Sequence, residues 1–157
     1  MNNKVKTRKA ARTVIFDEND MVAIIEVQNG DYHKIPGGGI DDGETEEQAA
    51  HREALEEAGC EVEILKKIGE QEFIDPADDN LTHYSVCFLA KKINSHETSY
   101  LTKEEKDKKF RLLWESVDEA IVLFKNVKTN EPFELAMNNR DRKFLEMAYE
   151  EYKILNK

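Results

Sequence analysis

The sequence predicts an α/β sandwich, and three observations lead to this fold class. Short β-prone apolar runs recur along the chain, among them residues 12–16 and 84–90. A segment with a helix-capping signal at Thr45 and a stop signal at Gly59 separates two groups of these runs. The C-terminal segment after Pro132 has apolar residues at helical spacing. Strands grouped around one central helix, with further helices flanking them, are typical of a layered α/β domain.

The first strands are predicted from β-prone runs bounded by turn-forming residues. Residues 12–16 and 21–27 form two such runs, and the acidic residues 17–20 between them form a turn. Residues 29–31 (Asn-Gly-Asp) turn the chain again, toward a short run at 32–35 and a loop with three consecutive glycines. Glycines there let the backbone pass close to a ligand or metal, where a side chain would clash.

The central helix has clear signals at both ends. Thr45 is a good N-cap residue, and Gln48 three positions later completes a capping box. The helix is predicted to run through about Ala58 and to end at Gly59, a typical C′ residue. One side of this helix is mostly small and apolar and is expected to pack on a sheet; it comprises His51, Ala54, Leu55 and Ala58. The opposite face is left for the glutamates.

The second half of the chain predicts further strands. Apolar and polar residues alternate along residues 61–74, which predicts one or two strands there. Residues 75–80 are predicted to be a loop. Residues 84–90 predict a buried strand, residues 93–109 are polar and irregular, and residues 110–114 predict one more short strand.

Two helices are predicted at the C-terminal end. Ser116 and Glu119 form a possible capping box for a short helix through Phe124. The segment from Pro132 predicts a second helix, with a possible interruption at residues 138–139 (Asn-Asn). Its apolar stripe is interpreted as core and comprises Leu145, Ala148, Tyr152 and Leu155.

Length and composition bound the class of protein. A chain of 157 residues is most simply one domain spanning residues 1–157. Cys60 and Cys87 do not suggest a disulfide framework, and two thiols fit a reducing compartment. The N-terminus has no apolar core for a signal peptide, and no run approaches membrane-spanning length. A cytoplasmic protein without a membrane partner is expected.

The net charge of −10 is concentrated in one segment. Residues 41–63 contain ten Asp and Glu residues against Arg52 alone, a balance of −9. An acidic chain is a poor general nucleic-acid binder, because that affinity comes from Lys and Arg. The basic segment at residues 1–12 is interpreted as a solvated arm, with the alternative that Arg8, Lys9 or Arg12 contacts substrate phosphates.

Three glutamates on the central helix predict a metal site. Glu53, Glu56 and Glu57 fall within an arc of roughly 100° on an α-helix. Carboxylates crowded in this way repel each other unless a cation lies among them. Oxygen ligands of this kind suit Mg²⁺ or Mn²⁺, and Mg²⁺ commonly lies between carboxylates and substrate phosphates. An acidic helix that is simply solvated is the alternative for these three residues alone.

The whole string of residues 38–60 resembles the box that defines the Nudix hydrolases, a family of nucleotide pyrophosphohydrolases. The matching pattern is Gly38, five residues, Glu44, seven residues and then Arg-Glu-Ala-Leu-Glu-Glu-Ala-Gly-Cys from Arg52. Ala54 and Cys60 are smaller than the aliphatic residues that the family pattern has at these positions. This difference affects how the helix packs and not the chemistry of the site. The resemblance implies an α-β-α sandwich with a mixed central sheet, and it implies Mg²⁺, or alternatively Mn²⁺, as the cofactor.

The resemblance also implies roles for individual residues. Glu56 and Glu57 are expected to be the chief metal ligands, together with the backbone carbonyl of Gly38. Glu53 is expected to be a further ligand or the base that deprotonates the attacking water. Arg52 is expected to pair with Glu44 and hold the loop on the helix. A further acidic ligand often comes from a downstream loop in this family; the candidates are Glu97, Glu104 and Glu105, each of which is otherwise a solvated surface acid.

The expected function is hydrolysis of a nucleoside diphosphate linked to another moiety, in a small phosphorylated nucleotide. The Nudix box does not specify the attached group, nor whether the chain is a monomer or a homodimer. Two other classes of function remain open. One is a nucleotide- or nucleotide-sugar-sensing domain without turnover, and the other is an isomerase or another phosphate-handling enzyme on the same scaffold.

Overall fold

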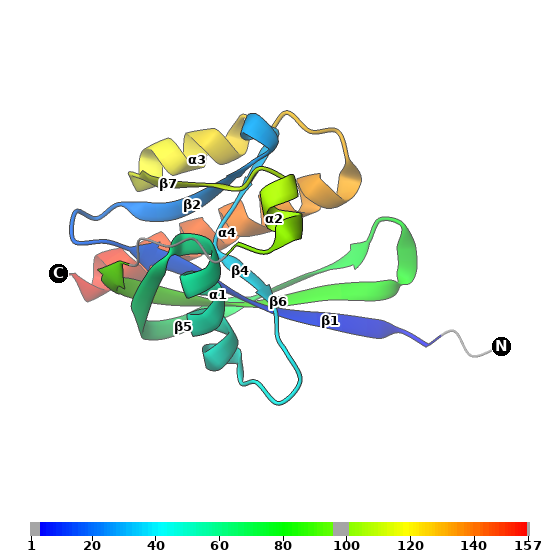
Figure 1. Cartoon of the computed structure of the whole chain (residues 1–157), viewed down its shortest axis with the longest axis horizontal. Helices are drawn as coiled ribbons and strands as arrows, with labels where there is room; N and C mark the ends of the chain where they lie inside the picture. Colours follow the sequence, from blue (N-terminus) through cyan, green and yellow to red (C-terminus); the bar gives the residue numbers. More distant parts are fainter. Residues whose placement is uncertain (1–3, 96–100, 157) are drawn as a thin grey trace.

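Seven strands form one mixed sheet in the computed structural model of the chain, which describes residues 4–95 and 101–156 (Figure 1). The strands are β1 (Lys6–Phe16), β2 (Val22–Val27), β3 (Tyr32–Lys34), β4 (Gly37–Gly39), β5 (Cys60–Asp75), β6 (Asp78–Ser95) and β7 (Arg111–Glu115). The helices are the 3-10 turn η1 (Gln28–Gly30) and the α-helices α1 (Glu46–Ala58), α2 (Lys103–Asp107), α3 (Val117–Lys125) and α4 (Pro132–Leu155).

The main path of the sheet has the order β3-β2-β1-β6-β5, while β4 pairs with β1 and β7 pairs with β2. Strands β1 and β6 are parallel, with Ala10 opposite Ser85, and the other pairs are antiparallel. The central strand β1 therefore contacts both the long β5–β6 hairpin and the glycine strand β4.

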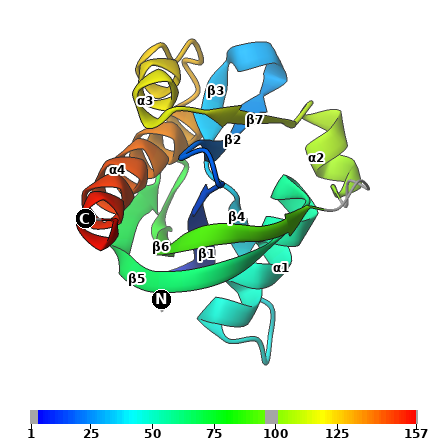
Figure 2. The same cartoon turned by 90° about the vertical axis from the view of Figure 1, so that its left-hand side faces the viewer.

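Helices cover both faces of this sheet, as Figure 2 shows for α1 on one side and α3 and α4 on the other. Successive side chains of a strand point to opposite faces. Val14 and Phe16 accordingly pack in the core beneath α3 and α4, and Ile15 packs in the core beneath α1. Each large apolar side chain buried in this way contributes about 1.5–3 kcal/mol. The predicted α-β-α sandwich with a mixed sheet is confirmed.

Helix α1 begins and ends where its sequence signals predicted. Both hydrogen bonds of the Thr45–Gln48 capping box are present, and Gly59 adopts a left-handed conformation with φ of 60°. The composition of its buried face differs from the prediction. His51 is exposed and Leu55 is half-buried, so neither belongs to that face. The residues that α1 buries are Ala49, Ala50, Glu53, Ala54, Glu57 and Ala58. Four alanines let the helix approach the sheet closely, and this approach also buries two of the glutamates.

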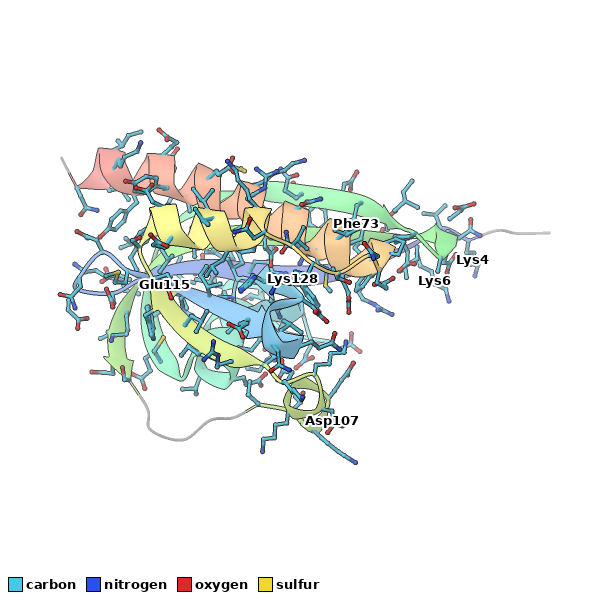
Figure 3. The ribbon with its side chains drawn as sticks, turned by 90° about the horizontal axis from the view of Figure 1, so that it is seen from above. Lys4, Lys6, Phe73, Asp107, Glu115 and Lys128 are labelled. Carbon is cyan, nitrogen blue, oxygen red and sulfur yellow. The ribbon has the colours of Figure 1, made fainter. Side chains whose placement is uncertain are left out.

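The N-terminal segment is not a free arm from Lys6 onward. β1 begins at Lys6, six residues before the predicted start, because its backbone pairs with β6 from Lys6 opposite Leu81 onward. The side chains of residues 6–9 remain exposed, so no apolar pattern marked this part of the strand. Figure 3 shows Lys4 and Lys6 at the protruding end of this ribbon.

Two other predicted interruptions differ from the structure, since the first is shorter than predicted and the second is absent. The loop predicted at residues 75–80 is a tight turn between β5 and β6, in which Asp75 Oδ1 accepts a hydrogen bond from the Ala77 backbone at 2.8 Å. Helix α4 continues through Asn138, whose buried side chain donates to the Phe124 carbonyl and accepts from the His33 backbone. That amide makes tertiary contacts, so it does not compete with the hydrogen bonds of the helix.

The remaining predicted elements are present. Residues 61–74 lie in the single strand β5, which contains several bulges, and residues 84–90 lie in β6. The Ser116 side chain caps α3 at the Glu119 backbone N–H. Across the two described stretches of the chain, every helix is too short or too polar to span a bilayer.

Candidate active site

The glycine strand β4 lies directly against the carboxylate of Glu53. Gly38 pairs with Ala11 of β1, and a Cβ atom at Gly38 would lie 2.4 Å from Glu53 Oε1. A Cβ atom at Gly37 would lie 2.5 Å from the Ala11 carbonyl oxygen. Any side chain would therefore separate the loop from the helix or from the sheet, so glycine is required for the close approach at both positions.

Glu57 is held by three hydrogen bonds in a buried position. The Gly37 backbone N–H donates to its Oε1 at 2.8 Å, and Lys34 Nζ donates to both of its oxygens at 3.1 and 3.2 Å. Lys34 also donates to the Gly37 carbonyl at 3.1 Å and lies 5.0 Å from the centre of the Phe110 ring. This buried lysine was not predicted as a site residue. Lys34 follows Tyr32 and His33 in β3, and no motif or periodic pattern in this short strand marks it as a site residue.

Arg52 joins the glycine loop to α1, as the predicted ion pair requires. Its Nε and Nη2 donate to the two Glu44 oxygens at 2.8 and 2.9 Å, and Nη2 also donates to the Gly39 carbonyl at 2.8 Å. Its Nη1 donates to Glu53 Oε1 at 2.9 Å and makes longer contacts of 3.3 Å with Glu56. The predicted Arg52–Glu44 pair is present, and the arginine compensates three carboxylates at once.

The Glu44–Arg52 pair predicts an acid-sensitive contribution to stability. The Arg52 hydrogen bonds and the Asp41 backbone N–H lower the pKa of Glu44 from its ordinary 4.5 to about 2. A carboxylate whose pKa is depressed by folding contributes stability above the unfolded pKa and loses it as the pH falls toward the folded pKa. We expect Glu44→Gln to lower the free energy of unfolding by about 1 kcal/mol at pH 7, as for a partly exposed bidentate pair.

Denaturant unfolding of both proteins between pH 7 and pH 2 measures this contribution. The difference between wild type and Glu44→Gln should shrink below pH 4.5 and vanish near pH 2. A difference that stays constant across this range would contradict the ion-pair assignment.

Three carboxylates from two helices converge beside the glycine loop. Oxygens of Glu53, Glu57 and Glu105 all lie within 4.8 Å of one another, and within the described residues this is the group that meets the geometry for holding a metal ion. The exposed fractions of Glu53 and Glu57 are only 7% and 5%, and Glu105 is half-buried. The expected solvent-facing cluster is therefore an enclosed one. Glu56 lies outside this group, with its carboxylate toward Arg52.

Burial makes the charges of this cluster costly. Desolvation, followed by the charge of Glu56, raises the pKa of Glu53 above its usual range. Desolvation raises the pKa of Glu57 as well, and the Lys34 ammonium only partly opposes this effect. Burial alone would raise the pKa of Glu105, but its hydrogen bonds with the Glu57 carboxyl and the Thr102 backbone outweigh burial and lower it. Protonation of one of these carboxyls would relieve their repulsion, and a divalent cation would relieve it more completely.

Helix α2, which supplies Glu105, lies in the segment that was predicted to be irregular. A capping box forms between Thr102 and Glu105, in which the Thr102 backbone N–H donates to Glu105 Oε1 at 2.8 Å. The sequence pattern Thr-x-x-Glu was the signal that could have revealed this helix. Glu104 is exposed and lies 3.6 Å from Lys108, outside the group of three converging carboxylates. Glu97, the third downstream candidate, lies outside the described residues.

A cavity of about 320 Å³ opens over the carboxylates, between the glycine strand, α1 and α2. Tyr32, Phe110 and Phe133 contribute aromatic surface to its lining, beside Arg12 and Lys34. This arrangement combines oxygen ligands, cations and aromatic rings at one opening. An enclosed acidic group beside a glycine strand on a mixed sheet is an arrangement that can hold a divalent cation against phosphate groups.

The chain belongs to the NUDIX domain family, whose model matches residues 6–137. A protein of Bacillus subtilis (strain 168) named "Putative 8-oxo-dGTP diphosphatase" is 33% identical over 61 residues. The matched stretch makes up 39% of this chain and 41% of that protein, so the alignment spans less than half of the curated relative.

Solved structures with the same fold resemble the chain over most of its length. A NUDIX hydrolase from Nitrosomonas europaea superposes with a TM-score of 0.64 at 21% identity, covering 87% of this chain and 88% of the other. A MutT protein from Methanosarcina mazei Go1 has a TM-score of 0.64 at 16% identity, covering 98% and 99%. A UDP-X diphosphatase has a TM-score of 0.63 at 14% identity, covering 94% of this chain and 64% of the other.

Proposed function

We propose that this Nudix domain hydrolyses a nucleoside diphosphate linked to another moiety, with Mg²⁺ as cofactor and Mn²⁺ as an alternative. The convergence of Glu53, Glu57 and Glu105 beside Gly38 is the observation that supports this proposal. The substrate is a small phosphorylated nucleotide rather than a nucleic acid, because an acidic, enclosed opening repels long polyanions. The 8-oxo-dGTP named for the Bacillus relative belongs to this class of substrates.

Different residues of the chain have different roles in the proposed hydrolysis. A bound divalent cation would supply charge stabilisation at the phosphate oxygens. Glu57 and Glu105 would hold that cation, together with the Gly38 carbonyl and with Glu56, which the family resemblance assigns. Glu53 takes the proton of the attacking water or completes the ligand set. Burial raises its pKa toward the range that suits a general base.

Arg52 and Glu44 have a positioning role in this proposal. Arg52 donates to Gly39, Glu44 and Glu53, so it fixes the distance between the glycine strand and α1. Lys34 has the same role on the other side, because it contacts both Glu57 and the Gly37 carbonyl. Two cations therefore keep the acidic cluster assembled before a metal ion binds.

Removal of divalent metal tests the proposal directly. We expect EDTA to abolish turnover of nucleoside triphosphates and nucleotide sugars, and added Mg²⁺ or Mn²⁺ to restore it. Product formation is measured by chromatography, and all buffers are freed of divalent metal beforehand. Full activity in EDTA would refute the metal site. Metal-dependent nucleotide binding without turnover would instead assign a sensing role.

Two acidic residues of α2 provide a matched test of the third ligand. We expect Glu105→Gln to weaken Mg²⁺ binding roughly tenfold or more, because a charged oxygen ligand is lost from the site. Asp107→Asn should leave the affinity unchanged, since that side chain is exposed and does not line the cavity. Isothermal titration with Mg²⁺ measures both variants. Equal affinities in the two variants would remove Glu105 from the ligand set.

A further inference from the structure

Three buried polar atoms without a hydrogen-bond partner belong to residues that line one small cavity. They are Arg12 Nε, Ser85 Oγ and Arg140 Nη2, from β1, β6 and α4. The exposed fractions of these residues are 8%, 1% and 5%. Buried polar groups in proteins are nearly always paired, so three unpaired atoms at one cavity indicate an absent partner. All three side chains can donate hydrogen bonds, which identifies that partner as an acceptor.

The charges around this cavity favour an anion. Arg140 Nε donates to Asp141 Oδ1 at 2.8 Å, and Asp141 Oδ2 accepts a hydrogen bond from the Ile35 backbone, so both oxygens of this carboxylate have a partner. Burial, followed by the nearby charge of Arg140, lowers the pKa of Arg12. The negative charges of Asp141, Glu57 and Glu53 act in the opposite direction but do not outweigh burial. Two guanidinium groups thus share one adjacent carboxylate, and the exposed Arg8 adds a further positive charge at the opening.

The size and place of the cavity make it an extension of the candidate active site. Its volume is about 110 Å³, whereas the acidic cavity measures about 320 Å³. Whole small molecules usually occupy about 300–1,000 Å³, so the smaller cavity suits one chemical group. Arg12, Gly39 and Phe133 line both cavities, so a single ligand can reach from one into the other.

An aromatic wall gives this cavity a fixed shape. The His83 ring lies 5.1 Å from Phe73 and 4.9 Å from Phe133, measured between ring centres, and its Nε2 lies 2.7 Å from Asp75 Oδ2. The Arg140 guanidinium lies 5.8 Å from the centre of the Phe73 ring. The Phe73 ring and the hydrogen bond to Asp141 hold the Arg140 guanidinium in place, so its free Nη2 keeps its position without a ligand.

We propose that Arg12, Ser85 and Arg140 form a second anion subsite that binds one phosphoryl group of the substrate, next to the acidic cluster. This inference rests on the proposed function, since it places a further phosphoryl group beyond the diphosphate that is hydrolysed. Guanidinium groups match phosphoryl oxygens in geometry and charge, and a serine hydroxyl adds a neutral donor. The subsite therefore favours nucleoside triphosphates over nucleoside diphosphates that carry an uncharged group.

Orthophosphate binding in EDTA tests the subsite without any contribution from metal. We expect saturable binding to wild type by isothermal titration, with a matching rise in melting temperature. Arg140→Gln should weaken binding on the order of 100-fold, and Ser85→Ala about tenfold, as for lost hydrogen bonds to a charged group. Arg142→Gln is the control on the same helix, because Arg142 pairs with Glu146 away from the cavity, and it should bind as wild type.

Ser85→Ala keeps the test valid if Arg140→Gln does not fold. Removing a buried hydroxyl that has no partner should leave the melting temperature unchanged or higher, while phosphate binding weakens. A purely structural role for Ser85 predicts no change in phosphate binding. Absence of saturable phosphate binding to wild type, or wild-type affinity in both Ser85→Ala and Arg140→Gln, would overturn the subsite.

Steady-state kinetics with Mg²⁺ test the subsite and the proposed hydrolysis independently of each other. Ser85→Ala should raise KM about tenfold for a nucleoside triphosphate and change KM little for a nucleoside diphosphate linked to a neutral hexose. Equal changes for both substrates would overturn the subsite. A wild-type protein that binds orthophosphate but hydrolyses neither compound would refute the proposed hydrolysis and support the subsite.

Discussion

Glu53→Gln is expected to lower kcat by about 10²-fold or more in a protein that remains folded. Glutamine keeps the shape and one acceptor oxygen, but it can neither take a proton nor contribute a full charge. Positioned acid–base groups typically contribute 10²–10⁴-fold to a rate. Substrate affinity, measured by equilibrium binding, should change much less than kcat, because the lost interaction belongs to the transition state.

Folding should survive this change because the position of Glu53 favours a neutral side chain. Glu53 is buried rather than directed at solvent, and burial disfavours its charged form. A neutral amide at this position relieves that cost and can still accept the Arg52 Nη1 hydrogen bond. The melting temperature of Glu53→Gln should therefore equal or exceed that of wild type.

Glu47→Gln provides the matched control, since Glu47 is exposed on the same helix. This variant should retain wild-type kcat and stability. A folded Glu53→Gln protein with near wild-type kcat would refute the role of Glu53 and move the base to another carboxylate, with Glu105 as the first candidate.

Asp141→Ala is expected to have the largest effect on stability, lowering the free energy of unfolding by about 3–5 kcal/mol. Asp141 is fully buried, with one oxygen on Arg140 Nε and the other on the Ile35 backbone N–H. Its removal leaves Arg140 and the nearby Arg12 without their shared carboxylate and leaves a backbone N–H unpaired. The corresponding fall in melting temperature is roughly 6–20 °C for a chain of this size.

Thermal and denaturant unfolding measure this effect, and Glu146→Ala on the same helix is the control. Glu146 forms an exposed pair with Arg142 at 2.7 Å, so its loss should cost only about 0.3–0.5 kcal/mol. Similar losses in both variants would show that Asp141 does not compensate the buried arginines.

The part of the site that could be predicted from sequence lies within one continuous segment. The family resemblance of this segment was enough to place Glu44 against Arg52, and helical spacing along α1 brought Glu53 and Glu57 to one side of the helix. The capping box and Gly59 fixed the helix ends, because such signals act within a few residues. Alternating apolar runs similarly predicted most strands.

The rest of the site depends on contacts between distant segments. Lys34 meets Gly37 and Glu57, and Asp141 meets the Ile35 backbone, only after the sheet has formed. Isolated polar residues carry no local signal of such contacts. The burial of Glu53 and Glu57 was missed because it depends on how closely the alanines of α1 approach β1 and β6. β1 was predicted too short because its first residues are paired through the backbone alone.

The construction of α2 has a consequence for how the site takes up its cation. This helix has five residues, none of them buried, yet it supplies Glu105. Such a short helix is anchored weakly, and local opening of so small a unit has a low free-energy cost. The apparent affinity for the cation is then the intrinsic affinity multiplied by the fraction of molecules in which α2 is docked. Substitutions that stiffen α2 would thus tighten cation binding from a distance, without touching a ligand atom.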